Sequence, residues 1–283
     1  MSLTRTIKEP DMTGASQVGT ASGKVFTRGN IVNTCLRCLT SSDVELTRAQ
    51  ILNDISDITV KVNGIPIIDA DATYLLDRQK FLGDAVGAGN IDGIIPISFE
   101  LEHLPSTQER RVSALGTAGV NTITIEVKVI AVAQLAKIEI YTEVDNEPIR
   151  RPGQHIRINK FNRTFGSTGT FEISDLPFQD VNVAGYLEMN FKYSTGSLDQ
   201  VTVKRNGLVV VDKLPSKLND VLNDRALRTN QSGYYNLSFA RSRDLASLLP
   251  MDGTSSLLLE TEWSSAAPNT FQIYTERVFR ELR

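Results

Sequence analysis

The chain has 283 residues, of which 41% are hydrophobic and 22% charged, and its formal net charge at pH 7 is −3. A chain of this length can bury roughly three quarters of its unfolded surface, so neither a metal ion nor a disulfide framework is needed for folding; two cysteines exclude such a framework. The small charge argues against a dedicated nucleic-acid-binding protein, and no apolar run reaches the ~20 residues that span a bilayer. Because the N-terminus lacks the apolar core of a signal peptide, we expect the protein to stay in the cytoplasm where it is made until it assembles.

One segment of the chain occurs twice. Residues 58–69 read ITVKVNGIPIID and residues 201–212 read VTVKRNGLVVVD, with six of the twelve positions identical. In each copy Asn-Gly lies between two β-branched runs, and this dipeptide tolerates the positive φ angles of a tight hairpin turn. We therefore expect Gly64 and Gly207 to occupy positive-φ positions in two equivalent β-hairpins.

Further matches follow in the same order, and their separation falls from 146 to 133 residues. They pair Gly23 with Gly169, residues 93–99 with 233–239, Gly116-Thr117 with Gly253-Thr254, Glu126 with Glu260, and IYTE at 140–143 with IYTE at 273–276. The steady fall is expected if small loop deletions accumulated in one of two tandem copies of a fold. We therefore predict an N-terminal arm (1–14), a first domain (15–144), a linker (145–161) and a second domain with a C-terminal tail (162–283).

Most of each copy is predicted to be strand. The β-branched and aromatic segments alternate in part, as in TITIEVKVIAV and FQIYTERVF. Helices are predicted after each hairpin, at 72–83 and 215–227, and after each middle strand, at 106–116 and 242–253, where Ser can cap the start and Gly the end. About eight short strands with two short helices in the connections predict an all-β fold of two tandem eight-stranded jelly rolls, in preference to an up-and-down barrel or an immunoglobulin sandwich.

This tandem arrangement resembles the double jelly-roll major capsid proteins, and in particular that of the corticoviruses, which are membrane-containing icosahedral bacteriophages. The segments that carry the resemblance are 111–129, 159–177 and the hairpin 198–212. The resemblance implies a structural, non-enzymatic coat protein that forms pseudo-hexagonal homotrimers, and these tile a shell around an internal lipid membrane in the virion. It also implies that the chain's partners are neighbouring trimers, minor capsid or vertex proteins and the membrane surface, without direct contact to nucleic acid.

Two motifs suggest chemistry but have simpler explanations. Cys35-Leu36-Arg37-Cys38 is a CxxC motif, yet its segment has the pattern of a strand, where i and i+3 face opposite sides, and no further cysteine is present to complete a zinc site. We expect both thiols to be small apolar packing residues. The segment GAGNIDG (87–93) lacks the spacing of a dinucleotide-binding loop and follows a helix, so we expect an ordinary loop.

Catalysis is limited by the two histidines, His103 and His155, which lie far apart in the sequence, and no G-x-S-x-G motif is present. We therefore expect no enzyme and no required cofactor. A structural calcium ion is a further hypothesis, and the clustered acids that would supply its oxygen ligands are Asp69, Asp71, Asp84 and Asp92; turn and helix-cap roles are favoured for these residues.

Basic residues gather in the predicted linker and the tail. Such segments can attract acidic phospholipid headgroups or acidic neighbours in a lattice. The residues are Arg150, Arg151, Arg157, Lys160, Arg163, Arg277, Arg280 and Arg283.

The alternative to a coat subunit is a tandem β-sandwich that binds carbohydrate or a receptor. Such a protein would present aromatic side chains to solvent, whereas the only tryptophan, Trp263, lies in a predicted core strand.

Overall fold

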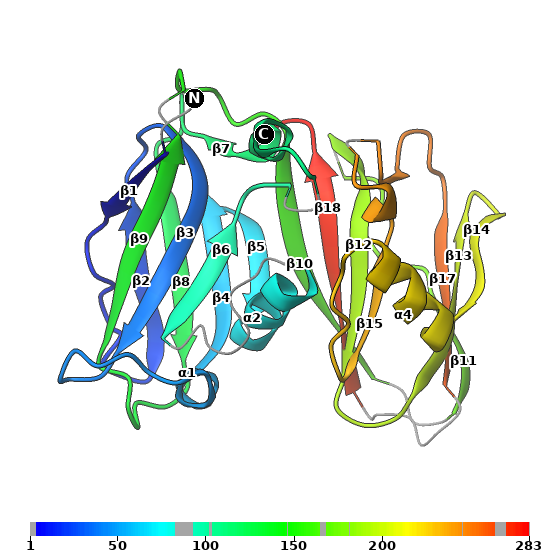
Figure 1. The fold of residues 1–283 in the computed structure, drawn as a ribbon, viewed down its shortest axis with the longest axis horizontal. Helices are drawn as coiled ribbons and strands as arrows, with labels where there is room; N and C mark the ends of the chain where they lie inside the picture. The colour runs from blue at the N-terminus through cyan, green and yellow to red at the C-terminus, as the bar shows by residue number, and fades with distance from the viewer. Residues whose placement is uncertain are drawn as a thin grey trace. The chain divides into compact units, whose positions relative to one another are not determined.

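The computed structural model describes residues 4–82, 93–101, 104–145, 147–164, 168–180, 182–244, 246–263 and 270–282 (Figure 1). The chain divides into two compact units, residues 1–159 with 281–283 and residues 160–280. Each unit has its own buried apolar residues.

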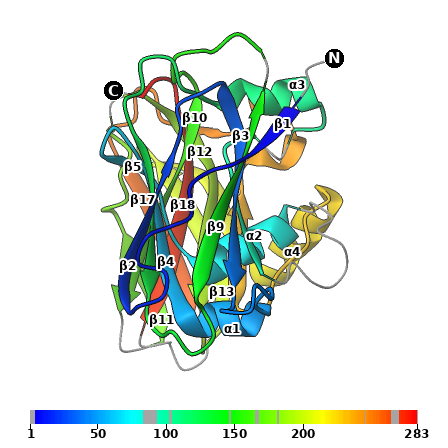
Figure 2. The same cartoon turned by 90° about the vertical axis from the view of Figure 1, so that its left-hand side faces the viewer.

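In the first unit two sheets have the strand orders β1-β9-β3-β6, with β7 also paired to β3, and β2-β8-β4-β5. β1 and β3 flank β9 in one sheet (Figure 1), and Figure 2 views the first unit from the side of β1. The strands are β1 (Thr4–Lys8), β2 (Gly19–Val25), β3 (Asn30–Leu39), β4 (Ile55–Val62), β5 (Ile65–Asp71), β6 (Ile94–Ser98), β7 (Leu115–Gly116), β8 (Ile123–Val129) and β9 (Lys137–Asp145). The helices are α1 (Arg48–Asp54), α2 (Ala72–Phe81), α3 (Thr107–Arg110) and the 3₁₀ turn η1 (Arg111–Ser113).

The second unit repeats this topology strand for strand. Its orders are β10-β18-β12-β15, with β16 also paired to β12, and β11-β17-β13-β14. The strands are β10 (His155–Thr164), β11 (Gly169–Ile173), β12 (Val183–Tyr193), β13 (Leu198–Arg205), β14 (Leu208–Pro215), β15 (Tyr234–Ser238), β16 (Leu249–Pro250), β17 (Leu257–Trp263) and β18 (Thr270–Phe279). The helical segments are α4 (Ser216–Arg225) and the 3₁₀ turn η2 (Ala240–Ser242). The prediction of two tandem jelly rolls is therefore confirmed, with strands β2–β9 between Gly19 and Asp145 and strands β11–β18 between Gly169 and Phe279.

Two predicted connecting segments contain strands. The predicted arm, 1–14, includes β1, which pairs with β9, and the predicted linker, 145–161, includes the first part of β10. β1 is only five residues long, too short for alternation to stand out. In β10 the alternation is present, because Ile156 and Ile158 are buried and Arg157 is partly exposed.

The strand register corrects one pairing of the repeat. Gly19 lies opposite Val129, and Gly169 lies opposite Trp263, 134 residues further along than Val129. The counterpart of Gly169 is therefore Gly19, and not Gly23. Both glycines have positive φ, 140° and 125°.

A second pairing is corrected in the same way. Leu115 pairs with Ile31 and Leu249 with Tyr186, so this part of the repeat also has a separation of 134 residues. Gly253 therefore corresponds to Gly119, and not to Gly116. The two have φ angles of 66° and 78°.

Both Asn-Gly hairpins form as predicted. Gly64 and Gly207 have φ angles of 82° and 77°, and the asparagines before them, Asn63 and Asn206, have φ angles of 49° and 52°. Positive φ at both central residues is the conformation of a type I′ turn. Asn-Gly is favoured there because neither residue pays the full steric penalty of that conformation.

The helices are partly as predicted. α2 and α4 lie after the hairpins, and Ser106 caps α3 by accepting a hydrogen bond from the backbone N–H of Glu109 at 3.4 Å. The prediction of a helix at 242–253 is wrong. Among the described residues 242–244 and 246–253, the only helical residue is Ser242, the last of η2, and it is followed by Arg243, whose φ of 56° is left-handed. The following residues include the two-residue strand β16, with Pro250, which cannot donate a helical hydrogen bond.

Candidate assembly surfaces

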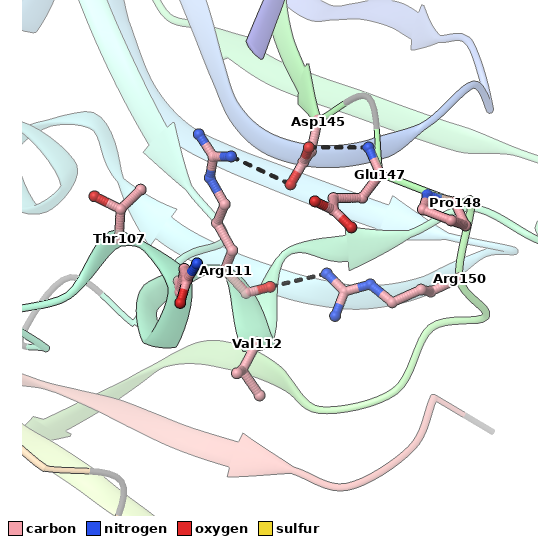
Figure 3. A pocket seen from close by; sticks show the side chains of 8 residues that line it. Thr107, Arg111, Val112, Asp145, Glu147, Pro148 and Arg150 are labelled. Carbon is pink, nitrogen blue, oxygen red and sulfur yellow. Dashed lines mark hydrogen bonds and ion pairs between the residues drawn. The ribbon is translucent and has the colours of Figure 1, made fainter. Parts of the chain in front are cut away.

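A pocket of about 680 Å³ lies in the first unit beside α3 and η1 (Figure 3). Arg111 spans its wall: Nη1 lies 3.3 Å from Oδ2 of Asp145, and Nη2 donates to Oγ1 of Thr4 at 2.6 Å. Asp145 is almost fully buried and also accepts from the backbone N–H of Glu147 at 3.0 Å. The guanidinium of Arg111 thus joins the ends of β1 and β9 to η1, and its own charge is largely compensated.

Arg150 forms the rim of the same pocket, and its backbone is firmly held. Its N–H donates to Oδ1 of Asn30 at 2.8 Å, and its carbonyl accepts from the N–H of Ala118 at 2.9 Å. Nη2 donates to the carbonyl of Arg111 at 2.9 Å, while the side chain stays exposed. Arg151 is exposed beside it in the sequence, so this end of the first unit presents two cationic side chains.

The other predicted basic residues differ in their surroundings. Arg157 donates from Nε to Nε2 of His155 at 3.1 Å, and Arg163 forms an ion pair with Asp175 at 2.7 Å. Lys160 is partly exposed on β10, and Arg283 lies outside the described residues.

Of the two remaining basic residues, one is not on the surface at all. Arg277 is buried in β18, where it pairs with Asp180, donates to the carbonyl of Pro177 at 3.0 Å and lies over the ring of Phe279. The prediction that Arg277 belongs to an exposed basic tail is therefore wrong. Arg280 is exposed and forms an ion pair with Asp252.

The predicted calcium ligands fall into two groups. Asp69 and Asp71 alternate in β5 and are partly exposed, and Asp71 occupies the N-cap position of α2 without a side-chain capping bond. Asp84 and Asp92 lie outside the described residues. Among the residues that the structure describes, no three His, Cys, Asp or Glu side chains converge as a metal site would require.

The CxxC motif lies in β3, as its pattern predicted. Burial raises the pKa of the Cys35 thiol to about 11 and that of Cys38 to about 12. Both are therefore protonated at neutral pH, whereas redox and metal-binding cysteines act as thiolates. Of the predicted loop 87–93, only Gly93 is described; it has a φ of 77°.

The two histidines do not form a site in the described residues. His103 lies outside them, and His155 is buried with Nδ1 2.9 Å from the carbonyl of Gly153. Burial, and to a smaller degree the charge of Arg157, lowers the pKa of His155 to about 4. The ring is therefore neutral at pH 7, donating to Gly153 and accepting from Arg157.

Sequence reasoning missed a charged cluster around Glu139 in β9. Lys8 and Lys137 each approach Oε1 of Glu139 at 2.7 Å, and Arg37 approaches Oε2 at 3.3 Å. The bond from Lys137, followed by that from Lys8, lowers the pKa of this carboxyl group to about 2. The alternation Lys137-x-Glu139-x-Tyr141 places these side chains on one face of the strand and was the available signal.

Exposed aliphatic residues are equally numerous in the two units, but in the second unit most of them lie on two neighbouring elements, β14 and α4. Three consecutive ones, Leu208, Val209 and Val210, lie at the start of β14, and Leu218 and Val221 follow on α4. Those of the first unit are dispersed, namely Val18, Val44, Val112, Ile130, Val132 and Ile149. β14 is therefore the strongest apolar candidate for an assembly contact.

The aromatic platform expected of a glycan-binding protein is not formed by the tryptophan. Trp263 is almost completely buried, with ring centroids 5.3 Å from those of both Tyr193 and Phe271. None of the described helices has the length and apolar character needed to cross a bilayer.

Two units of identical jelly-roll topology in one chain define a double jelly-roll protein, the fold of several viral capsid proteins. The structure matches the major capsid protein P2 of bacteriophage PM2 with a TM-score of 0.81 at 17% identity, covering 99% of each chain. It matches the major capsid protein of Sulfolobus turreted icosahedral virus with a TM-score of 0.68 at 12% identity, covering 99% of this chain and 97% of that one. It matches the PBCV-1 virus capsid with a TM-score of 0.59 at 11% identity, covering 98% and 94%.

Sequence comparison gives the family. The viral coat protein P2 N-terminal domain matches residues 7–145, and the P2 C-terminal domain matches residues 156–280. The chain belongs to the viral coat protein P2 family. It is a major capsid protein, a structural component of the virion that assembles with copies of itself into the capsid. No curated protein sequence matches the chain significantly.

Proposed function

We propose that three copies of the chain form a capsomer with a pseudo-hexagonal outline, and that these capsomers tile an icosahedral shell around a lipid membrane. The observation that carries this proposal is the exact repetition of strand order between the two units. Three chains with two equivalent units each give six similar sides, which suits a lattice with six neighbours around a capsomer. The resemblance to corticovirus coat proteins supports the internal membrane.

Light scattering during size-exclusion chromatography tests the trimer. The expected mass is three times that of the 31.2 kDa chain, and end-on images of the particle should show six lobes of similar size. A strict monomer at micromolar concentration contradicts the proposal. A tandem binding protein would instead give saturable hits on a glycan array.

We further propose that Arg150 and Arg151 contact acidic groups, with the phospholipid headgroups of the inner membrane as the favoured source. Each cationic side chain near an anionic surface contributes about 1 kcal/mol. Arg150→Gln with Arg151→Gln should weaken flotation with phosphatidylserine vesicles at low salt, whereas Arg225→Gln, an exposed residue of α4, should leave it unchanged. Equal flotation of the parent and the double variant contradicts membrane contact. The two arginines would then be assigned to a lattice contact with an acidic neighbour.

Two further partners belong to this proposal, a structural calcium ion near Asp69 and Asp71 and minor proteins at the capsid vertices. Calcium binding is tested by the shift of the thermal midpoint on addition of CaCl₂ against MgCl₂. An ion bound to the folded state raises the midpoint as its concentration exceeds the dissociation constant. An unchanged midpoint contradicts the calcium hypothesis.

A further inference from the structure

The floor of the pocket beside α3 and η1 contains two charges that compensate each other. Asp145 is almost fully buried, accepts from the backbone N–H of Glu147 at 3.0 Å and lies 3.3 Å from Nη1 of Arg111. The guanidinium of Arg111 also donates to Oγ1 of Thr4 at 2.6 Å. Because these charges are already paired, a ligand of the pocket is recognised by the side chains of its rim.

The second unit has an apolar residue at the position of Asp145. Asp145 lies opposite Asn30 in the ladder of β9 and β3, and Val278 lies opposite Gly185 in the ladder of β18 and β12. The two residues are separated by 133 positions, as are the repeated IYTE segments. The jelly-roll fold therefore does not require a buried carboxylate at this end of the sheet, and in the first unit this carboxylate holds an arginine that lines the pocket.

Two side chains of opposite charge on the rim are open to a ligand. Arg150 donates from Nη2 to the carbonyl of Arg111, and its Nε and Nη1 have no hydrogen-bond partner within the described residues. The carboxylate of Glu147 likewise accepts no hydrogen bond from the described part of the chain. Both side chains line the same pocket, and no ion pair between described residues joins them (Figure 3).

The rest of the rim combines polar and apolar side chains. Thr107 and Gln108 are exposed on α3, and Val112 and Pro148 present apolar surface. The volume of about 680 Å³ lies in the range of small-molecule sites, roughly 300–1,000 Å³. The pocket thus offers a guanidinium for an anion, a carboxylate for a cation, and apolar surface for the carbon atoms of a ligand.

We propose that this pocket binds the phosphoethanolamine head group of a phospholipid, with the phosphate on Arg150 and the ammonium group on Glu147. A guanidinium presents a planar fork of donors that matches the oxygens of a phosphate. An ammonium group supplies N–H donors and a counter-charge to the carboxylate, whereas a glycerol head group supplies no charge.

A single small zwitterion reaches both charges because Arg150 and Glu147 line one pocket. Val112 and Pro148 then contact the glycerol end of the lipid. This inference rests on the proposed contact of Arg150 with the inner membrane, and it adds a preference among lipid head groups.

Soluble head groups test the site without a bilayer. Glycerophosphoethanolamine is titrated into the full chain and followed by ligand-observed NMR, with glycerophosphocholine and glycerophosphoglycerol as comparisons. Choline carries the same charge as ethanolamine but has no N–H to donate, and glycerol carries no charge. We expect the ethanolamine compound to bind about fivefold more tightly than either, the equivalent of one exposed ion pair.

Two variants separate the roles of the two charges. Arg150→Gln should weaken the binding of all three compounds, whereas Glu147→Gln should remove only the preference for ethanolamine. Glu109→Gln, at an exposed position of α3 outside the pocket lining, should leave both properties unchanged. All three residues are exposed, so the variants should fold like the parent. Equal affinity of the parent for the three compounds, or an unchanged preference in Glu147→Gln, overturns the inference.

Flotation separates this inference from the proposed membrane contact. Vesicles of phosphatidylcholine with phosphatidylethanolamine and vesicles of phosphatidylcholine alone have the same net charge, so a difference between them reports the head group and not the surface potential. The parent should float more with the ethanolamine lipid, and Glu147→Gln should remove the difference.

Flotation with phosphatidylserine vesicles that depends on Arg150, without a difference between the two neutral vesicles, overturns the head-group site and leaves the proposed membrane contact intact. An absence of flotation with all three kinds of vesicle overturns both. The pocket would then be assigned to a contact with a neighbouring coat subunit.

Discussion

The asparagine of each hairpin does more than tolerate the turn. Oδ1 of Asn63 accepts from the backbone N–H groups of Asn121 and Thr122 at 2.9 and 3.1 Å. Oδ1 of Asn206 accepts from those of Ser255 and Ser256 at 2.7 and 3.2 Å. The turn thus holds the loop that leads into β8 or β17, which explains why Asn-Gly is present in both copies.

Asn206→Gly separates these two roles, because glycine keeps the positive φ and loses the side chain. We expect the free energy of unfolding to fall by about 1–3 kcal/mol, since several net hydrogen bonds are removed. Urea titration followed by circular dichroism measures this loss. Asn63→Gly is the matched variant of the first unit, and full stability of both variants would show that the loop is held by other contacts.

Gly207→Val tests the turn conformation itself. A Cβ at Gly207 meets no heavy atom within 4 Å, so the only cost is the backbone strain of positive φ. That strain costs about 1–3 kcal/mol. We expect a lower thermal midpoint and a lower yield of trimer, and unchanged values of both would contradict the assigned turn.

His155 makes stability depend on pH in a defined window. Its folded pKa of about 4 lies below the ordinary value of 6.5, so only the unfolded chain binds the proton between these values. Stability is fully present above pH 6.5 and is lost as the pH falls toward 4. The loss from this group between pH 7 and pH 5 is about 2 kcal/mol.

The measurement is the urea midpoint at pH 7 and pH 5 for the parent and for His155→Gln. We expect a smaller difference between the two pH values in the variant, even though its stability at pH 7 is lower. Glu139 does not interfere, because its lowered pKa of about 2 makes its contribution disappear only as the pH falls from about 4.5 toward 2. An unchanged difference between pH 7 and pH 5 would contradict the role of His155.

At the level of elements, the sequence predicted those helices, turns and strands whose formation depends on neighbouring residues in the chain. The hairpins, α2, α4 and the strand character of β3 followed from turn chemistry and β-branched runs. The strand register could not be predicted in this way, because Gly23 and Gly19 are equally good matches to Gly169 by spacing alone. Only the ladder with β8 and β17 distinguishes them.

Features that depend on tertiary contacts could not be predicted from the sequence either. β1 has five residues and forms a strand because β9 is beside it. The segment 242–253 has helix-forming residues, yet β16 pairs with β12 and draws it into the sheet. Arg277 was assigned to a surface because of its charge, but Asp180 and the ring of Phe279 stabilise it inside the second unit.

One element that was missed had a local signal. α1 begins with a capping box, in which Thr47 accepts from the N–H of Gln50 and the side chain of Gln50 accepts from the N–H of Thr47 at 2.8 Å. Thr47→Ala should lower the free energy of unfolding by about 1 kcal/mol, because both orphan donors at the helix start depend on this pair. Ser41→Ala, in the exposed turn before the helix, is the control, and equal midpoints in urea would contradict the cap.

At the scale of the whole molecule, the exposed apolar residues of β14 link stability to concentration. If the copies in the proposed trimer cover Leu208, Val209 and Val210, these side chains are in water only in the monomer, and assembly stabilises the folded state by mass action. The thermal midpoint of the parent should therefore rise with protein concentration from 1 to 100 µM. Val210→Lys should remove this dependence and leave the midpoint near that of the dilute parent, because the lysine opposes association more than it opposes folding of an exposed strand. A parent midpoint independent of concentration would mean that the folded chain gains nothing from its copies, and the exposed valines of β14 would then require a different partner.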